Sequence, residues 1–102
     1  MKEYNILYEI EKYLLSINFK KEENSYSKYL GFGRVYVIID VKTIDFIFSS
    51  YDEDPFKVKL KESLYNLINV YNINDYIKYV LYNIGQSYIR YKIFGELEDN
   101  GL

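Results

Sequence analysis

The sequence contains no cysteine, no histidine and no tryptophan, and its single proline is Pro55. Without cysteine, the chain has no disulfide and no thiolate metal site. Without histidine and cysteine, it also lacks the commonest general base and the best nucleophile of enzymes. Neither a phosphate-binding Walker motif nor a Gly-x-Ser-x-Gly nucleophile elbow occurs. We therefore predict that the protein is not an enzyme and that it uses no cofactor.

Long apolar runs are also missing from the sequence. No stretch approaches the roughly 18 consecutive apolar residues that a transmembrane helix needs. Residues 1–4 include Glu3 and form no uninterrupted apolar segment, so they lack the pattern of a signal peptide. The formal net charge of −2 argues against a strongly basic nucleic-acid binder. We expect a soluble, cytoplasmic protein that does not bind membranes.

Apolar and aromatic side chains are abundant. Hydrophobic residues make up 49% of the 102 residues, which excludes a wholly disordered chain and fits one domain over residues 1–102. The sequence contains 14 tyrosines. Because Tyr, Ile, Asn and Lys are encoded by A/T-rich codons, this composition indicates mutational bias in an A/T-rich genome. A functional demand for tyrosine is the alternative.

Hydrophobic periodicity predicts a helix near each end of the chain. Within residues 3–17, apolar side chains recur at intervals of three and four residues and form one stripe. The last helix is predicted to start after Asn74 and to run to about Phe94. Gly95 is a natural C-terminal stop, which leaves Glu96–Leu102 as a frayed tail.

Three short segments in between predict a small antiparallel sheet. Residues 26–30 are a candidate first strand, residues 34–40 are rich in β-branched side chains, and residues 43–49 alternate cleanly. The glycines of Gly31-Phe32-Gly33 mark a turn between the first two. The links are too short for the crossovers of a parallel sheet, so we expect a meander.

The segment around Pro55 gives two conflicting signals. Asp54 followed by Pro55 is typical of a helix start, and apolar residues continue at helical spacing to about Asn72. Residues 56–61 instead alternate strictly between apolar residues and lysine, as in an amphipathic strand. We favour the helix, because the cap and the downstream periodicity agree. The fold is then α+β, with a small antiparallel sheet of about three strands and with the N-terminal helix and two C-terminal helices packed on one face.

Carboxylates are the remaining candidates for chemistry. Residues 52–54 are three adjacent acids that could hold a hard cation, although helix capping accounts for them as well. Asp40 and Asp45 flank the second predicted hairpin, which is consistent with a turn and surface role. We predict no metal site.

The two long predicted helices carry more apolar surface than one face requires. An ordinary surface helix has one apolar stripe, whereas the last helix has a second stripe nearly opposite the first. The second stripe contains Tyr79, Tyr82, Ile89 and Ile93, and the first helix repeats the pattern with Tyr4, Tyr8 and Leu15. Such side chains are either buried between other parts of the domain or form an intermolecular interface. We favour the interface.

Aromatic and cationic residues also lie side by side along the chain. Single-stranded nucleic acid requires stacking platforms beside phosphate partners. The candidate contacts are Lys28, Tyr29, Arg34, Tyr36, Arg90 and Lys92. Tyrosine is so common here that such neighbours also arise by chance.

These observations predict a small non-catalytic interaction protein that binds another protein or a second copy of itself. The A/T-rich composition and the small size suggest a phage or mobile-element protein, for which inhibition of a host defence or regulatory protein is a natural role. The alternative is an accessory protein that binds single-stranded nucleic acid through Tyr, Lys and Arg surfaces.

Overall fold

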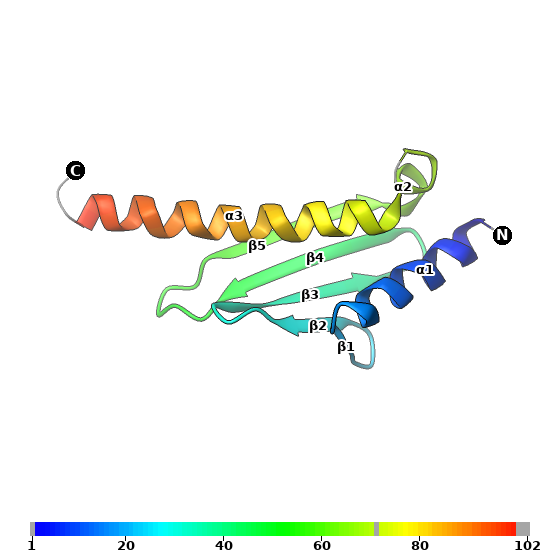
Figure 1. Ribbon diagram of the computed structural model, residues 1–102, viewed down its shortest axis with the longest axis horizontal. Helices are drawn as coiled ribbons and strands as arrows, with labels where there is room; N and C mark the ends of the chain where they lie inside the picture. Colours follow the sequence, from blue (N-terminus) through cyan, green and yellow to red (C-terminus); the bar gives the residue numbers. More distant parts are fainter. Residues whose placement is uncertain (1, 71, 100–102) are drawn as a thin grey trace.

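The computed structural model describes the backbone of residues 2–70 and 72–99, and the side chains of residues 6–67 and 72–95. The elements follow one another as α1 (Lys2–Ser16), β1 (Lys20–Lys21), β2 (Tyr26–Tyr29), β3 (Gly33–Ile39), β4 (Thr43–Ser50), β5 (Lys57–Ser63), α2 (Leu64–Val70) and α3 (Ile73–Asp99). Figure 1 shows the strands as one sheet with α3 running along it. The α+β class and the antiparallel sheet are therefore as predicted.

The sheet is larger than expected, with five strands in the order β1-β2-β3-β4-β5, all antiparallel. β2, β3 and β4 correspond to the three predicted strands of the meander, and tight turns connect them. Leu30 N donates to Gly33 O at 2.8 Å in the first turn, and Asp40 N donates to Thr43 O at 2.9 Å in the second. Gly31 has a φ of 91°, a left-handed conformation that glycine adopts without a steric penalty. The additional strands are the two-residue β1 and the seven-residue β5.

The helix predicted from Pro55 is wrong, because residues 57–63 form β5. Pairing with β4 decides the outcome: Ser50 N donates to Phe56 O at 3.0 Å, and Phe56 N donates to Ser50 Oγ at 2.9 Å. Asp54 is exposed in the preceding loop and caps no helix. The downstream helical periodicity belongs to α2, which begins at Leu64.

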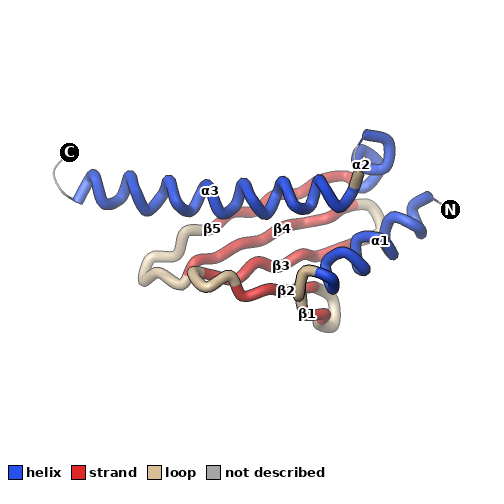
Figure 2. The backbone as a smooth tube through the Cα atoms, in the orientation of Figure 1, coloured by secondary structure: helices blue, strands red, loops and turns tan. Residues whose placement is uncertain are grey.

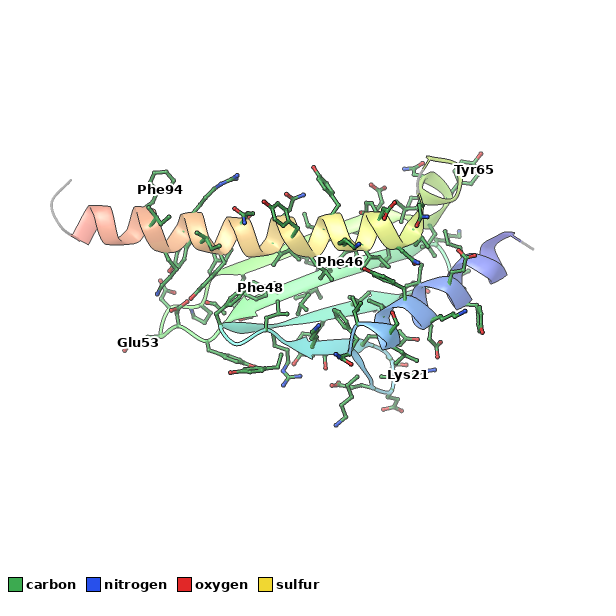
Figure 3. The ribbon with its side chains drawn as sticks, viewed as in Figure 1. Lys21, Phe46, Phe48, Glu53, Tyr65 and Phe94 are labelled. Carbon is green, nitrogen blue, oxygen red and sulfur yellow. The ribbon has the colours of Figure 1, made fainter. Side chains whose placement is uncertain are left out.

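The helices cover one face of the sheet. Figure 2 shows α3 running lengthwise along the sheet and α1 lying obliquely over one end of it, and in Figure 3 Phe46 and Phe48 point from β4 into the space between the layers. Phe46 meets the ring of Tyr76 edge-on, with ring centroids 6.2 Å apart. Ile10 of α1 and Ile77 of α3 are fully buried in the same core.

α3 continues through Gly95 to Asp99, beyond the expected end at about Phe94. A glycine inside a helix costs only about 1 kcal/mol relative to alanine, which a long packed helix tolerates. The expected frayed tail, Glu96–Leu102, thus lies within the helix as far as Asp99, and residues 100–102 lie outside the described part. Among the described helices, none combines the length and the apolar character needed to cross a bilayer.

Candidate binding surfaces

The side of α3 that faces away from the sheet carries a continuous row of side chains. We call this row the α3 seam, and it consists of Tyr79, Tyr82, Gln86, Ile89 and Ile93. Successive members are three, four, three and four residues apart, which is the heptad spacing of positions that meet a partner helix. Tyr79, Tyr82, Ile89 and Ile93 are 65%, 64%, 48% and 50% exposed. The domain therefore does not bury the second stripe itself.

The opposite side of α3 explains why the seam points outward. Ile77, Val80 and Ile84 recur at three and four residues and are buried against the sheet. One turn further on, Tyr88 stacks on Phe32 with ring centroids 4.6 Å apart. A helix held by this face presents the α3 seam to solvent.

The flanks of the α3 seam are cationic. Five positions from 78 to 92 border the row, and they hold Lys78, Asn83, Gly85, Arg90 and Lys92. Lys92 is engaged in an ion pair with Asp52, with Nζ 2.9 Å from Oδ1. Lys78 and Arg90 are exposed. Asp75 lies four residues before Tyr79 on the same side of α3, just beyond the N-terminal end of the seam.

The other predicted interface residues lie on α1. Tyr8 and Leu15 are exposed, as an interface would require, whereas the side chain of Tyr4 lies outside the described residues. Figure 1 shows α1 at the end of the sheet away from the C-terminal half of α3. Tyr8 and Leu15 are therefore separate from the Ile89–Ile93 end of the α3 seam.

Asp52 anchors the loop between β4 and β5 to α3. Its carboxylate accepts hydrogen bonds from the Tyr88 hydroxyl and from Lys92 Nζ, both at 2.9 Å. The hydrogen bond from Lys92 is the main cause that lowers the pKa of Asp52, and the same pairing raises the pKa of Lys92. Glu53 and Asp54 are exposed. Among the described residues, no group of three or more acidic or other metal-ligating side chains is placed to hold an ion.

The face of the sheet opposite the helices forms a second surface, which we call the open sheet face. Directly opposed residues of an antiparallel sheet share a face, so the register defines its rows. One row is Tyr29, Arg34, Ser49 and Lys57; the next is Lys20, Ser27, Tyr36, Ile47 and Lys59; the third is Ile38, Asp45 and Lys61. The alternating burial of β3 and β4 confirms that this face is the less buried one. No element of the described chain packs over it.

Aromatic and cationic groups meet at one end of the open sheet face. Tyr29 and Tyr51 stack with ring centroids 5.7 Å apart, and they are 58% and 57% exposed. A hydrogen bond with the Tyr51 side chain is the main cause that raises the pKa of Arg34. Arg34 Nη1 also donates to Ser27 Oγ at 3.3 Å, and Ser27 Oγ donates to Glu22 at 2.7 Å. Neighbouring side chains therefore hold the guanidinium on this face.

Only some of the predicted nucleic-acid contacts come together. Tyr29, Arg34 and Tyr36 share the open sheet face. Lys28 is on the helix-covered face, where its Nζ donates to the Ile17 carbonyl at 2.6 Å just after α1. Arg90 and Lys92 belong to α3 and lie elsewhere.

The sequence reasoning missed the three lysines of β5, which the structure adds to this face. Lys57, Lys59 and Lys61 all point to the open side, because the residues between them, Val58 and Leu60, face the helices. The sequence signal for these lysines is the strict alternation of residues 56–61, which competes with the helix signal of Asp54 and Pro55.

Comparison with protein-family models, with curated proteins and with solved structures finds no match for this chain.

Proposed function

We propose that this is a small non-catalytic binding protein that acts by protein–protein contact through the α3 seam. The exposure of a heptad-spaced row on a helix whose other side is already packed carries this proposal. Tyrosine suits such a surface, since its ring can be buried while its hydroxyl finds a polar partner. Isoleucine supplies apolar area, and burial of such a side chain contributes about 1.5–3 kcal/mol.

The partner that best complements the α3 seam is an amphipathic helix with acidic flanks. A second copy would offer neither Lys78 nor Arg90 an acidic partner, because the flanking positions between 78 and 92 hold no glutamate or aspartate. A helix with glutamate or aspartate beside its apolar stripe would instead pair with both cations. Gln86 lies in the middle of the row, where a polar residue fixes register. We therefore favour a foreign protein over a homodimer.

The biological setting that fits this proposal is an inhibitor encoded by a phage or mobile element and acting on a host protein in the cytoplasm. It rests on the A/T-rich composition and the small size of the chain. The surface chemistry of the α3 seam adds the kind of host element that would be bound, an acidic amphipathic helix.

The test uses a designed three-heptad peptide with leucine along its stripe and glutamate at its flanks. Fluorescence anisotropy should show binding to the wild-type protein, and Ile89→Glu should weaken it by more than about tenfold, as for a central interface residue. Val41→Glu is the matched control, because Val41 is exposed in the β3–β4 turn and does not belong to the α3 seam. Equal loss in both variants would contradict the proposal.

Folding and oligomeric state are measured on the same samples. We expect Ile89→Glu to retain the wild-type circular dichroism spectrum, since Ile89 is 48% exposed. Sedimentation should show a wild-type monomer. Unfolding of Ile89→Glu would place that residue in the core, and a stable wild-type dimer lost in Ile89→Glu would assign the α3 seam to a second copy.

A further inference from the structure

The open sheet face has a chemistry that the α3 seam does not share. It combines exposed tyrosines with a cluster of cations on a surface that no described element covers. A sheet face of a small domain is ordinarily packed on one side and polar on the other. Here the outer side also carries half-buried apolar residues, Ile38 on β3 and Ile47 on β4. This mixture indicates a ligand with both flat apolar groups and negative charge.

We propose that the open sheet face binds single-stranded nucleic acid. Tyr29, Tyr36 and Tyr51 are the stacking platforms for bases. Lys20, Arg34, Lys57, Lys59 and Lys61 are the partners for phosphates. This inference is independent of the proposed function, because it uses the opposite layer of the molecule and none of the residues of the α3 seam.

The charge distribution supports this assignment. The whole protein has a formal net charge of −2, yet the open sheet face carries five cations against two carboxylates, Asp45 and Glu22. The acids of residues 52–54 lie instead in the loop that packs under α3. A polyanion approaching this protein would therefore be attracted to one face in particular.

The spacing of the cations suits a polyphosphate chain. Lys57, Lys59 and Lys61 are alternate residues of β5, so neighbouring members are about 7 Å apart along the strand. Successive phosphates of an extended single strand have a similar separation. A strand of nucleic acid that follows β5 could thus place consecutive phosphates beside consecutive lysines, with its bases directed inward over β4 and β3.

The aromatic groups lie where those bases would reach. Tyr36 is two strands inward from Lys59 in the same row. The Tyr29–Tyr51 pair lies at one end of the face, and Arg34 is directly opposite Tyr29 in the same row. Stacking on tyrosine is worth about 1–3 kcal/mol per base, and it tolerates any sequence because every base has a π-face.

A flat sheet favours single strands over duplex DNA or an acidic peptide. A broad sheet face cannot enter a groove of a duplex, whose bases are already stacked, whereas unpaired bases can be splayed onto aromatic side chains. An acidic peptide would satisfy the lysines but would leave the three tyrosines without flat groups to stack on.

The lysines of β5 also have a simpler explanation, because β5 is an edge strand and lysine on an edge discourages pairing with another chain. Edge protection explains the lysines of β5, but it does not explain the tyrosines or Arg34. Edge protection also predicts no binding of nucleic acid, so a binding measurement distinguishes it from the proposed site.

The experiment titrates the protein into fluorescein-labelled oligothymidylate and oligouridylate and follows anisotropy. We expect binding of both, with an affinity that falls steeply with salt. If three or four phosphates are neutralised, log K should fall by about 2–3 units per tenfold rise in salt. Tighter binding of oligothymidylate would identify DNA as the preferred single strand, and tighter binding of oligouridylate would identify RNA.

Variants assign the binding to the open sheet face. Lys57→Glu/Lys59→Glu should abolish it, whereas Lys12→Glu/Lys42→Glu, which makes the same change of charge elsewhere, should have a much smaller effect. Tyr36→Ala or Tyr51→Ala should weaken binding by between about fivefold and 150-fold at constant charge. Asp45→Asn, which removes the carboxylate opposite Lys61, should strengthen it. Ile89→Glu on α3 should leave it unchanged.

Five results would overturn the inference. If no saturable binding occurs at low salt, the lysines of β5 serve only to protect the edge of the sheet. Equal loss in the two lysine double variants would show a delocalised charge effect. Tyrosine variants that bind as wild type, or a duplex that binds as tightly as the single strand, would remove the stacking role. Competition by polyglutamate as effective as that by unlabelled oligonucleotide would assign the face to acidic peptides.

Discussion

The hydroxyl of Tyr88 on α3 donates a hydrogen bond of 2.9 Å to Asp52, which lies 36 residues earlier in the loop between β4 and β5. Lys92, one turn after Tyr88, pairs with the other oxygen of the same carboxylate. The ring of Tyr91 stacks on Phe56 with centroids 4.8 Å apart and closes the far end of the loop. These contacts hold α3 on the sheet, and the direction of the α3 seam depends on them.

The first prediction concerns the pH dependence of this anchor. The pKa of Asp52 is lowered from its ordinary 3.8 in the folded protein, so its contribution to stability is full above that value and is lost as pH falls through the folded-state pKa. Asp52→Asn should therefore lower the melting temperature at pH 7, and the gap to wild type should shrink in acid. Thermal unfolding followed by circular dichroism from pH 7 to pH 2 measures this, with Glu53→Gln as the neighbouring control. A gap that widens in acid would contradict the assignment.

The second prediction follows from the strand that replaces the expected helix. Asp54 caps no helix, so Asp54→Ala should change the free energy of unfolding by less than about 0.5 kcal/mol, as for an ordinary surface site. A genuine N-cap would lose about 1 kcal/mol. Urea unfolding distinguishes these values. A loss of the larger size would favour the helix over β5.

The third prediction concerns close packing at the start of β3. A Cβ atom added to Gly33 would lie 2.5 Å from the carbonyl oxygen of Ser49 and 2.6 Å from Cζ of Phe48. Gly33→Ala should therefore destabilise the protein by about 1–3 kcal/mol, the usual effect of overpacking. Gly95→Ala is the matched control: no atom lies within 4 Å of its added Cβ, and in a helix it should stabilise by about 0.5–1 kcal/mol. Both are measured by urea unfolding, and a neutral Gly33→Ala would contradict the packing described for this turn.

The sequence predicted the structure best where a segment carries only one periodic pattern, either helical or alternating. The two stripes of α3 follow from spacing alone, and burial of Ile77 and Ile84 against exposure of Tyr82 and Ile93 agrees with them. β2 to β4 could be predicted equally well from the sequence, because the alternation of side chains and the turn glycines indicate the same hairpins.

The segment after Asp54 could not be resolved in the same way. The local cap signal of Asp54 and Pro55 is worth about 1 kcal/mol, whereas pairing of β5 along β4 involves a whole ladder of hydrogen bonds that sequence does not show. That error also concealed the open sheet face, because Lys57, Lys59 and Lys61 join Arg34 and Tyr36 only when residues 57–63 are a strand.

We propose that the α3 seam selects a partner helix by charge at its flanks. The direct measurement compares two designed peptides that share the same apolar stripe, one with glutamate and one with lysine at the flanks. Wild-type protein should prefer the glutamate peptide by at least about tenfold at low salt, a difference of about 1.4 kcal/mol. The Lys78→Glu/Arg90→Glu variant should reverse that preference. Unchanged preference in this variant, or equal binding of both peptides by the wild type, would contradict selection by charge at the flanks.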